Sequence, residues 1–160
     1  MAARLPRRRG GDQVNCVVTI GEIQTLPAAV ASLEAIQALQ IAVLASDLPL
    51  IDIPVEHAFA DGLYRRLMHM RAGDLVIGKL HRTNHFGVLM RGVVDVWEPG
   101  GAKTRITAPA LLTTKAGTKR VIHALADVEW VTFHATEHTD PEMIERDIID
   151  PETELLEKMS

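Results

Sequence analysis

Between residues 63 and 135 the sequence is a succession of short runs typical of β-strands, which glycine and proline separate. The runs cover residues 63–70, 75–80, 86–97, 104–108, 111–114, 120–124 and 128–135. The separators include Gly73, Gly92, Pro109 and Gly117. Strands this short, interrupted this regularly, form antiparallel hairpins. The sequence therefore predicts a mainly β protein, a small antiparallel β-barrel or jelly roll.

Helical patterns lie on both sides of these runs. Residues 27–46 are rich in alanine and place apolar side chains at helical spacing, which predicts an amphipathic helix. Thr25 is a candidate cap, and Pro27 lies where a first-turn proline is tolerated. Residues 141–149 resume a helical period and predict a short C-terminal helix.

A length of 160 residues fits a single domain with extensions, because one hydrophobic core can close at this size. We expect four regions: a disordered basic tail at 1–12, an N-terminal extension with its helix at 13–54, the barrel at 55–138, and an acidic C-terminal helix and tail at 139–160.

The composition excludes several classes of protein. No apolar run is long enough to span a bilayer, so no membrane association is expected. A single cysteine, Cys16, excludes an internal disulfide. The net charge of -4 argues against a general nucleic-acid binder, although the arginine-rich residues 1–12 could contact phosphate. We expect a cytoplasmic or virion location.

Two histidines flank Arg82-Thr83-Asn84. In a fully extended strand His81 and His85 would be roughly 13 Å apart, too far to share an ion. The intervening residues must therefore bend, and both imidazoles could then face the interior of the β structure. His123 and His134 are the candidates for a third ligand.

The segment from Gly78 to Gly92 and the segment from Lys115 to His123 resemble the two motifs of the cupin family. Counted back from Gly92, His85 stands at the family's glutamate, His81 at its second histidine and Lys79 at its first histidine. Lys115-Ala116-Gly117 replaces the Pro-x-Gly turn, and Arg120 stands at the third histidine. The resemblance covers about residues 63–135 and implies a cupin-like fold around an interior pocket.

Residues 53–140 are also similar to a group of small proteins from tailed-phage genomes. The likeness rests on residues 54–64, 78–81, 117–121 and 130–137 together with Pro109. It implies a cupin-like protein with a role in or around a virion.

The pocket then has three interpretations. His81, His85 and His123 could hold one divalent transition metal, Zn, Fe, Ni or Mn, which needs a third protein ligand beside a histidine pair. The histidines could instead bond to each other or to buried water, with no metal. Finally, Lys79 and Arg120, at positions where the family has ligands, could bind a carboxylate or phosphate.

Other polar and aromatic residues have simpler predicted roles. His57 is expected in a loop at the edge of the barrel, and Cys16 has no visible activating partner. Trp97, Trp130, Phe86 and Phe133 are expected in the core.

Two functions follow from these patterns. The first is a binding or assembly module, such as a virion-associated accessory protein, that forms a homo-oligomer through the helix and the barrel faces and contacts other virion proteins. The alternative is a metal-dependent enzyme of isomerase or dioxygenase type that acts on a small acid.

Overall fold

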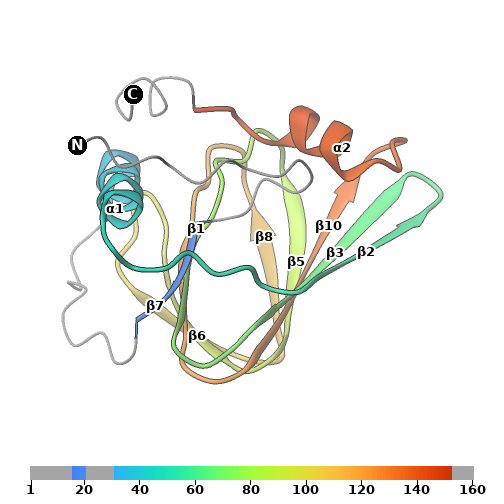
Figure 1. Cartoon of the computed structure of the whole chain (residues 1–160). Coiled ribbons are helices and arrows are strands. Elements are labelled where there is room, and N and C mark those ends of the chain that lie inside the picture. The colour runs from blue at the N-terminus through green and yellow to red at the C-terminus, as the bar shows by residue number, and fades with distance from the viewer. Residues whose placement is uncertain (1–15, 21–30, 153–160) are drawn as a thin grey trace.

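The computed structural model describes residues 16–20 and 31–152, whose ten strands form two antiparallel sheets that face each other (Figure 1). The first sheet has the order β1-β4-β9-β6-β7, and the second has the order β2-β3-β10-β5-β8. All neighbouring strands are antiparallel. The predicted mainly β jelly roll is confirmed, but the sheets remain two layers and do not close into a barrel.

The strand bounds follow the sequence runs closely. The first sheet comprises β1 (Cys16–Thr19), β4 (Asp74–Ile77), β9 (Val121–Ala124), β6 (Val93–Trp97) and β7 (Thr104–Thr107). The second sheet comprises β2 (Val55–Ala60), β3 (Leu63–Met70), β10 (Val128–Ala135), β5 (His85–Arg91) and β8 (Ala110–Thr114).

The main core lies between the two sheets. Leu89 and Trp130 of the second sheet pack there with Val94, Val96 and Ile122 of the first sheet, and all five are buried. Burial of one such side chain contributes about 1.5–3 kcal/mol. This core fixes the inward faces of β5 and β10, the strands that carry two of the candidate histidines.

The N-terminal helix α1 (Leu33–Ala45) covers the outer face of the first sheet, where Ile36 and Val43 pack in a second cluster of buried residues (Figure 1). It begins later than predicted. Ser32 has an extended backbone and accepts a hydrogen bond from the Ala35 amide, which makes it the N-cap. The predicted caps at residues 25 and 27 lie outside the described residues.

The hairpin between β2 and β3 corrects the prediction of a loop around His57. Asp61 and Gly62 connect the strands with φ angles of 35° and 82°. Two consecutive residues with positive φ form the tight turn that suits a two-residue hairpin. His57 therefore lies in a strand, opposite Arg66 of β3.

Gly92 lies where the chain crosses from β5 in the second sheet to β6 in the first. Its φ angle is 97°, and a Cβ atom there would lie 2.4 Å from the backbone oxygen of Asp127. Both facts require glycine. The turn divides the predicted run 86–97 into two strands on different sheets.

The C-terminal helix α2 (Pro141–Ile148) lies over one end of the second sheet, beside β10 (Figure 1). Asp140 caps its N-terminus through the Glu142 amide. Ile144 and Ile148 are buried in contact with Tyr64. Neither α1 nor α2 is long and apolar enough to cross a membrane.

The outer face of the second sheet carries exposed apolar side chains. Phe86 is 66% exposed and Leu111 is 86% exposed. Because side chains alternate along a strand, Phe86 points away from the core that its neighbour His85 faces. The prediction that Phe86 belongs to the core is therefore wrong, and Phe133, which pairs with it on the same face, is only partly buried. Trp97 and Trp130 are buried as predicted.

Candidate functional site

Three histidines from three parts of the chain meet at one end of the space between the sheets. The ring centroids of His81 and His85 are 4.5 Å apart, those of His85 and His134 are 4.4 Å apart, and those of His81 and His134 are 6.0 Å apart. We call these three residues the histidine cluster.

Strand register brings His85 and His134 together. Phe86 of β5 pairs with Phe133 of β10, so His85 and His134 are the next cross-strand neighbours along the two strands. Both side chains are buried on the inward face, on the same side of the strands as Leu89 and Trp130.

His81 reaches the cluster from the segment between β4 and β5. Arg82 and Thr83 bend the chain, and the Asn84 side chain accepts a hydrogen bond of 2.8 Å from the Ala116 amide. The bend between the two histidines was predicted from their spacing. It replaces the large separation of an extended strand with contact between the rings.

Four of the six ring nitrogens in the cluster are buried and have no hydrogen-bond partner among the described residues. They are Nδ1 of His81, both ring nitrogens of His85, and Nδ1 of His134. Buried polar atoms in native proteins nearly always have partners, because an unpaired one costs about 1–3 kcal/mol. This concentration of unpaired nitrogens indicates a place for a ligand.

The cluster is neutral at ordinary pH. Burial, followed by the charges of the other two histidines and of Arg120 and Arg66, lowers the pKa of His81 to about 3. Burial also lowers the pKa of His134 to about 3, with smaller contributions from His85 and Arg66. Neutral imidazole is the form that coordinates a metal ion.

Burial lowers the pKa of His85 as well, and the charge of Arg120 adds to the effect. The nearby backbone of Thr83 acts in the opposite direction and raises the pKa of His85. Neither ring nitrogen of His85 has a hydrogen-bond partner of normal geometry within the described residues. Each ring of the histidine cluster is therefore neutral, and one of its two nitrogens has a lone pair that can coordinate a metal ion.

Arg120 lies beside the cluster, as its effect on two of the histidines shows. Its guanidinium is 5.7 Å from the Trp130 ring centroid and donates a hydrogen bond of 2.7 Å to Thr114, the residue opposite His85 in β8. It also pairs with Glu98, whose side chain is 44% exposed. The candidate ligand-binding residue Arg120 is thus next to the candidate metal ligands.

The wall formed by β3 adds residues that the sequence did not single out. Tyr64 stacks on His134 with ring centroids 5.9 Å apart, and its hydroxyl lies 2.7 Å from Nδ1 of His57. Arg66 is opposite Thr132, whose hydroxyl is 3.0 Å from Nε2 of His134. Only the register of β2, β3 and β10 relates these residues, so no motif could have identified them.

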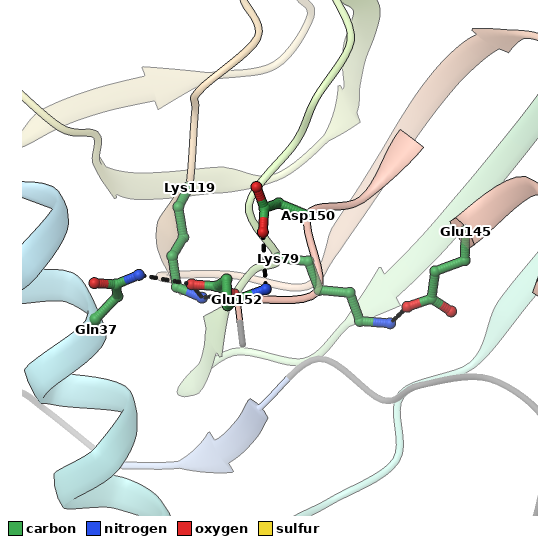
Figure 2. A network of polar contacts seen from close by, with 6 residues as sticks. All are labelled: Gln37, Lys79, Lys119, Glu145, Asp150 and Glu152. Carbon is green, nitrogen blue, oxygen red and sulfur yellow. Dashed lines mark hydrogen bonds and ion pairs between the residues drawn. The ribbon is translucent and has the colours of Figure 1, made fainter. Parts of the chain in front are cut away.

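Two of the predicted site residues lie elsewhere. Lys79 pairs with Glu145 of α2 (Figure 2). His123 lies in β9 opposite Leu75 and Asp95, on the face that α1 covers. The structure does not bring His123 together with His81 and His85; the neighbour of that pair is His134, which the sequence left open as the other candidate.

Within residues 16–20 and 31–152, no group of three or more His, Cys, Asp or Glu side chains is already arranged to hold a metal ion. The centroid distances of the histidine cluster nevertheless suit one ion. With metal–nitrogen bonds of about 2.1 Å, three imidazoles around a tetrahedral ion have ring centres about 5 Å apart. The spacing of the ring centres therefore fits one metal ion.

Comparisons with known proteins concern the arrangement of the strands. A cupin superfamily protein from Desulfitobacterium hafniense is 11% identical, with 74% of this chain and 96% of that chain covered and a TM-score of 0.47. Ectoine synthase from P. lautus is 13% identical, with 59% and 71% covered and a TM-score of 0.49. An acetylacetone dioxygenase from Acinetobacter johnsonii is 13% identical, with 52% and 59% covered and a TM-score of 0.44.

The chain thus spans about three fifths of the length of the acetylacetone dioxygenases that it matches. No family model matches the sequence. No curated protein matches it either. Several of the matching structures are cupins. The likeness to tailed-phage proteins stays a prediction.

Proposed function

We propose that the protein binds one divalent transition metal through His81, His85 and His134 and holds a small carboxylic acid beside it. One observation carries the proposal: three neutral imidazoles lie in contact, and four of their buried nitrogens have no hydrogen-bond partner within the described residues. Imidazole nitrogen suits Zn, Fe and Ni at such a site, whereas Mn prefers oxygen ligands. The choice of His134 in place of His123 rests on the contact between its ring and the other two.

Rotation of the imidazole rings would bring their nitrogens towards one ion without backbone movement, because the ring centres already have suitable spacing. Three protein ligands leave at least one coordination position for water or a bound acid. When bound, the metal would supply a Lewis acid that polarises a ligand oxygen.

The surrounding charges favour an anion next to the ion. Arg120 and Arg66 both act on the cluster strongly enough to lower the pKa of His81. Two positive charges oppose binding of a bare divalent cation, and a carboxylate would offset them. Arg120 offers the planar guanidinium that binds carboxylates with two parallel hydrogen bonds, in competition with its half-exposed partner Glu98.

The metal part of the proposal is tested by elemental analysis of protein purified without a histidine tag, followed by titration of the metal-free protein with Co²⁺. We expect one metal per chain, and a loss of affinity of more than about tenfold in His134→Ala. His123→Ala is the matched control, a buried histidine of the other sheet, and should bind as the parent protein does. Absence of stoichiometric metal, or equal losses in both variants, would refute the assignment.

The anion part is tested by calorimetry of the metal-loaded protein with acetate and succinate. Arg120→Gln should weaken binding of whichever acid binds, because it removes the charge and the paired donors. Unchanged affinity in Arg120→Gln would exclude this residue from acid binding. The isomerase or dioxygenase activity and the virion role remain predictions from the sequence resemblance.

A further inference from the structure

The segment of residues 78–82, which carries His81, is bonded along one side to the strand entry at residues 117–120. The Gly78 amide donates to the Arg120 carbonyl over 2.8 Å, and the His81 amide donates to the Thr118 carbonyl over 3.0 Å. The Gly117 amide donates to the carbonyl of His81 over 2.8 Å. The backbone of His81 is therefore fixed on this side by two hydrogen bonds.

The other side of the same segment is bonded to the end of the described chain. His81 forms an antiparallel bridge with Ile149. The Arg82 amide donates to the Ile148 carbonyl, and the Asp150 amide donates to the Leu80 carbonyl, each over 2.8 Å. Residues 148–150 thus act as a short edge strand, and His81 lies in the middle of three bonded segments.

A buried ion pair joins the two flanks. The Lys119 ammonium lies 2.8 Å and 3.0 Å from the two carboxylate oxygens of Glu152, and the Gln37 amide donates to the same carboxylate over 3.1 Å (Figure 2). The Lys119 side chain is 0% exposed and that of Glu152 is 9% exposed. Lys119 follows Thr118 and precedes Arg120, which bond residues 78–82 from the opposite side.

The physical consequence follows from the cost of burying a charge. An ammonium with no access to water requires a counter-charge, and removal of one partner of a buried pair leaves the other uncompensated. With Glu152 charged, the edge strand stays against residues 78–82. With its charge removed, solvent must reach Lys119, and the edge strand is the segment that can move aside because it lies at the edge of the three bonded segments.

We infer that Glu152 is a positioning residue for His81: through its ion pair with Lys119 it keeps residues 148–150 bonded to the segment that presents this histidine to the cluster. The inference rests on the proposed metal site, in which His81 is a ligand. Lys79 and Glu145 form a second, separate link between the same segment and α2 (Figure 2).

The test compares Glu152→Gln with the full-length parent protein. Gln keeps the shape of Glu152 and removes its charge. We expect Co²⁺ affinity to fall at least about tenfold, the size of effect that loss of an outer-shell partner of a metal ligand produces. Amide hydrogen exchange should accelerate by a similar factor at Arg82 and Asp150, whose hydrogen bonds hold the edge strand, and should not change at Leu89 in the core.

Two controls separate positioning from general loss of stability. Asp147→Asn removes the exposed pair between Asp147 and His138 in the same C-terminal region and should change Co²⁺ affinity by less than about twofold. Gly92→Ala destabilises the opposite end of β5 and should also leave the affinity unchanged. If Glu152→Gln fails to fold, Glu152→Asp takes its place, because it keeps the charge and shortens the reach of the carboxylate to Lys119, and it should produce the same losses at a smaller size.

The outcomes distinguish this inference from the proposed function. If the parent protein binds Co²⁺ and Glu152→Gln binds it equally well, or if Gly92→Ala weakens binding to the same extent, the inference is overturned and the metal site stands. If the parent protein binds no Co²⁺, the metal site is refuted, and the exchange measurement decides the positioning: faster exchange at Arg82 and Asp150 supports it, and unchanged exchange overturns it.

Discussion

Acid should destabilise the metal-free protein well before its carboxylates are protonated, because the histidine cluster is buried in the neutral form. The folded pKa values of His81 and His134 are about 3, against an ordinary value of 6.5. Between these values the unfolded chain binds protons that the folded chain does not. The stability is therefore complete above about pH 6.5 and is lost as the pH falls below it.

The magnitude follows from the size of the shift. At pH 5 each of the two histidines disfavours the folded state by about 2 kcal/mol, since one pH unit below the unfolded pKa corresponds to about 1.4 kcal/mol. Together they should lower the free energy of unfolding by roughly 4 kcal/mol between pH 8 and pH 5. This is a large share of the roughly 5–15 kcal/mol by which a typical domain is stable.

Urea unfolding at pH 8 and pH 5, with a chelator present, measures this difference. For a slope of about 2 kcal/mol per molar urea, the midpoint should fall by roughly 2 M. In His134→Gln the difference between the two pH values should shrink by about 2 kcal/mol, whatever the variant does to stability at pH 8. His138→Gln, which changes a histidine with a side chain 42% exposed, should leave the difference unaltered.

The reasoning is refuted if His134→Gln retains the full pH dependence of the parent protein. It is also refuted if the ring proton of His134, followed by NMR in the folded state, titrates with a midpoint near 6.5. Either result would mean that the ring can take up a proton without the cost that its burial implies.

Three further expectations concern other parts of the molecule. Gly92→Ala should lower the free energy of unfolding by about 1–3 kcal/mol in urea titrations, because a positive φ and a backbone contact both exclude a Cβ atom, whereas Gly101→Ala, with its nearest contact at 3.7 Å, should be close to neutral. Burial raises the pKa of Cys16 to about 11, so a thiol reagent should modify it in urea and not in the folded protein at neutral pH; rapid modification of the folded chain would contradict this. Light scattering should show the homo-oligomer that the sequence predicts. The double variant Phe86→Ser with Leu111→Ser should weaken this oligomer, because exposed apolar side chains favour association. A monomeric parent protein would contradict the prediction.

The strands were the part of the fold that the sequence predicted best. Runs such as 63–70 and 128–135 coincide with β3 and β10, because alternating apolar residues between turn-forming residues identify a strand locally. The C-terminal helix was predicted from the helical period of its apolar residues, which is also a local pattern. The strand β2 was missed, because its run of Glu56, His57 and Ala58 has no strong apolar alternation.

The faces of the strands were harder to assign than the strands. Phe86 and His85 are adjacent, and the sequence gives no sign of which one faces the core. Pairing with β10 and β8 decides it, and places the aromatic ring in solvent and the imidazole inside. The same uncertainty applied to His123, whose face could be known only once β9 was seen between β4 and β6.

Turn chemistry and side-chain periodicity act over a few residues, so the mainly β architecture, the flanking helices and the bend that brings His81 to His85 could be predicted locally. Three other features depend on the folded chain: His134 as the third member of the cluster, Arg66 and Arg120 beside it, and the contact of Glu152 with Lys119. These contacts join residues far apart in the chain, and strand order and register, which no local pattern encodes, set the distances between them.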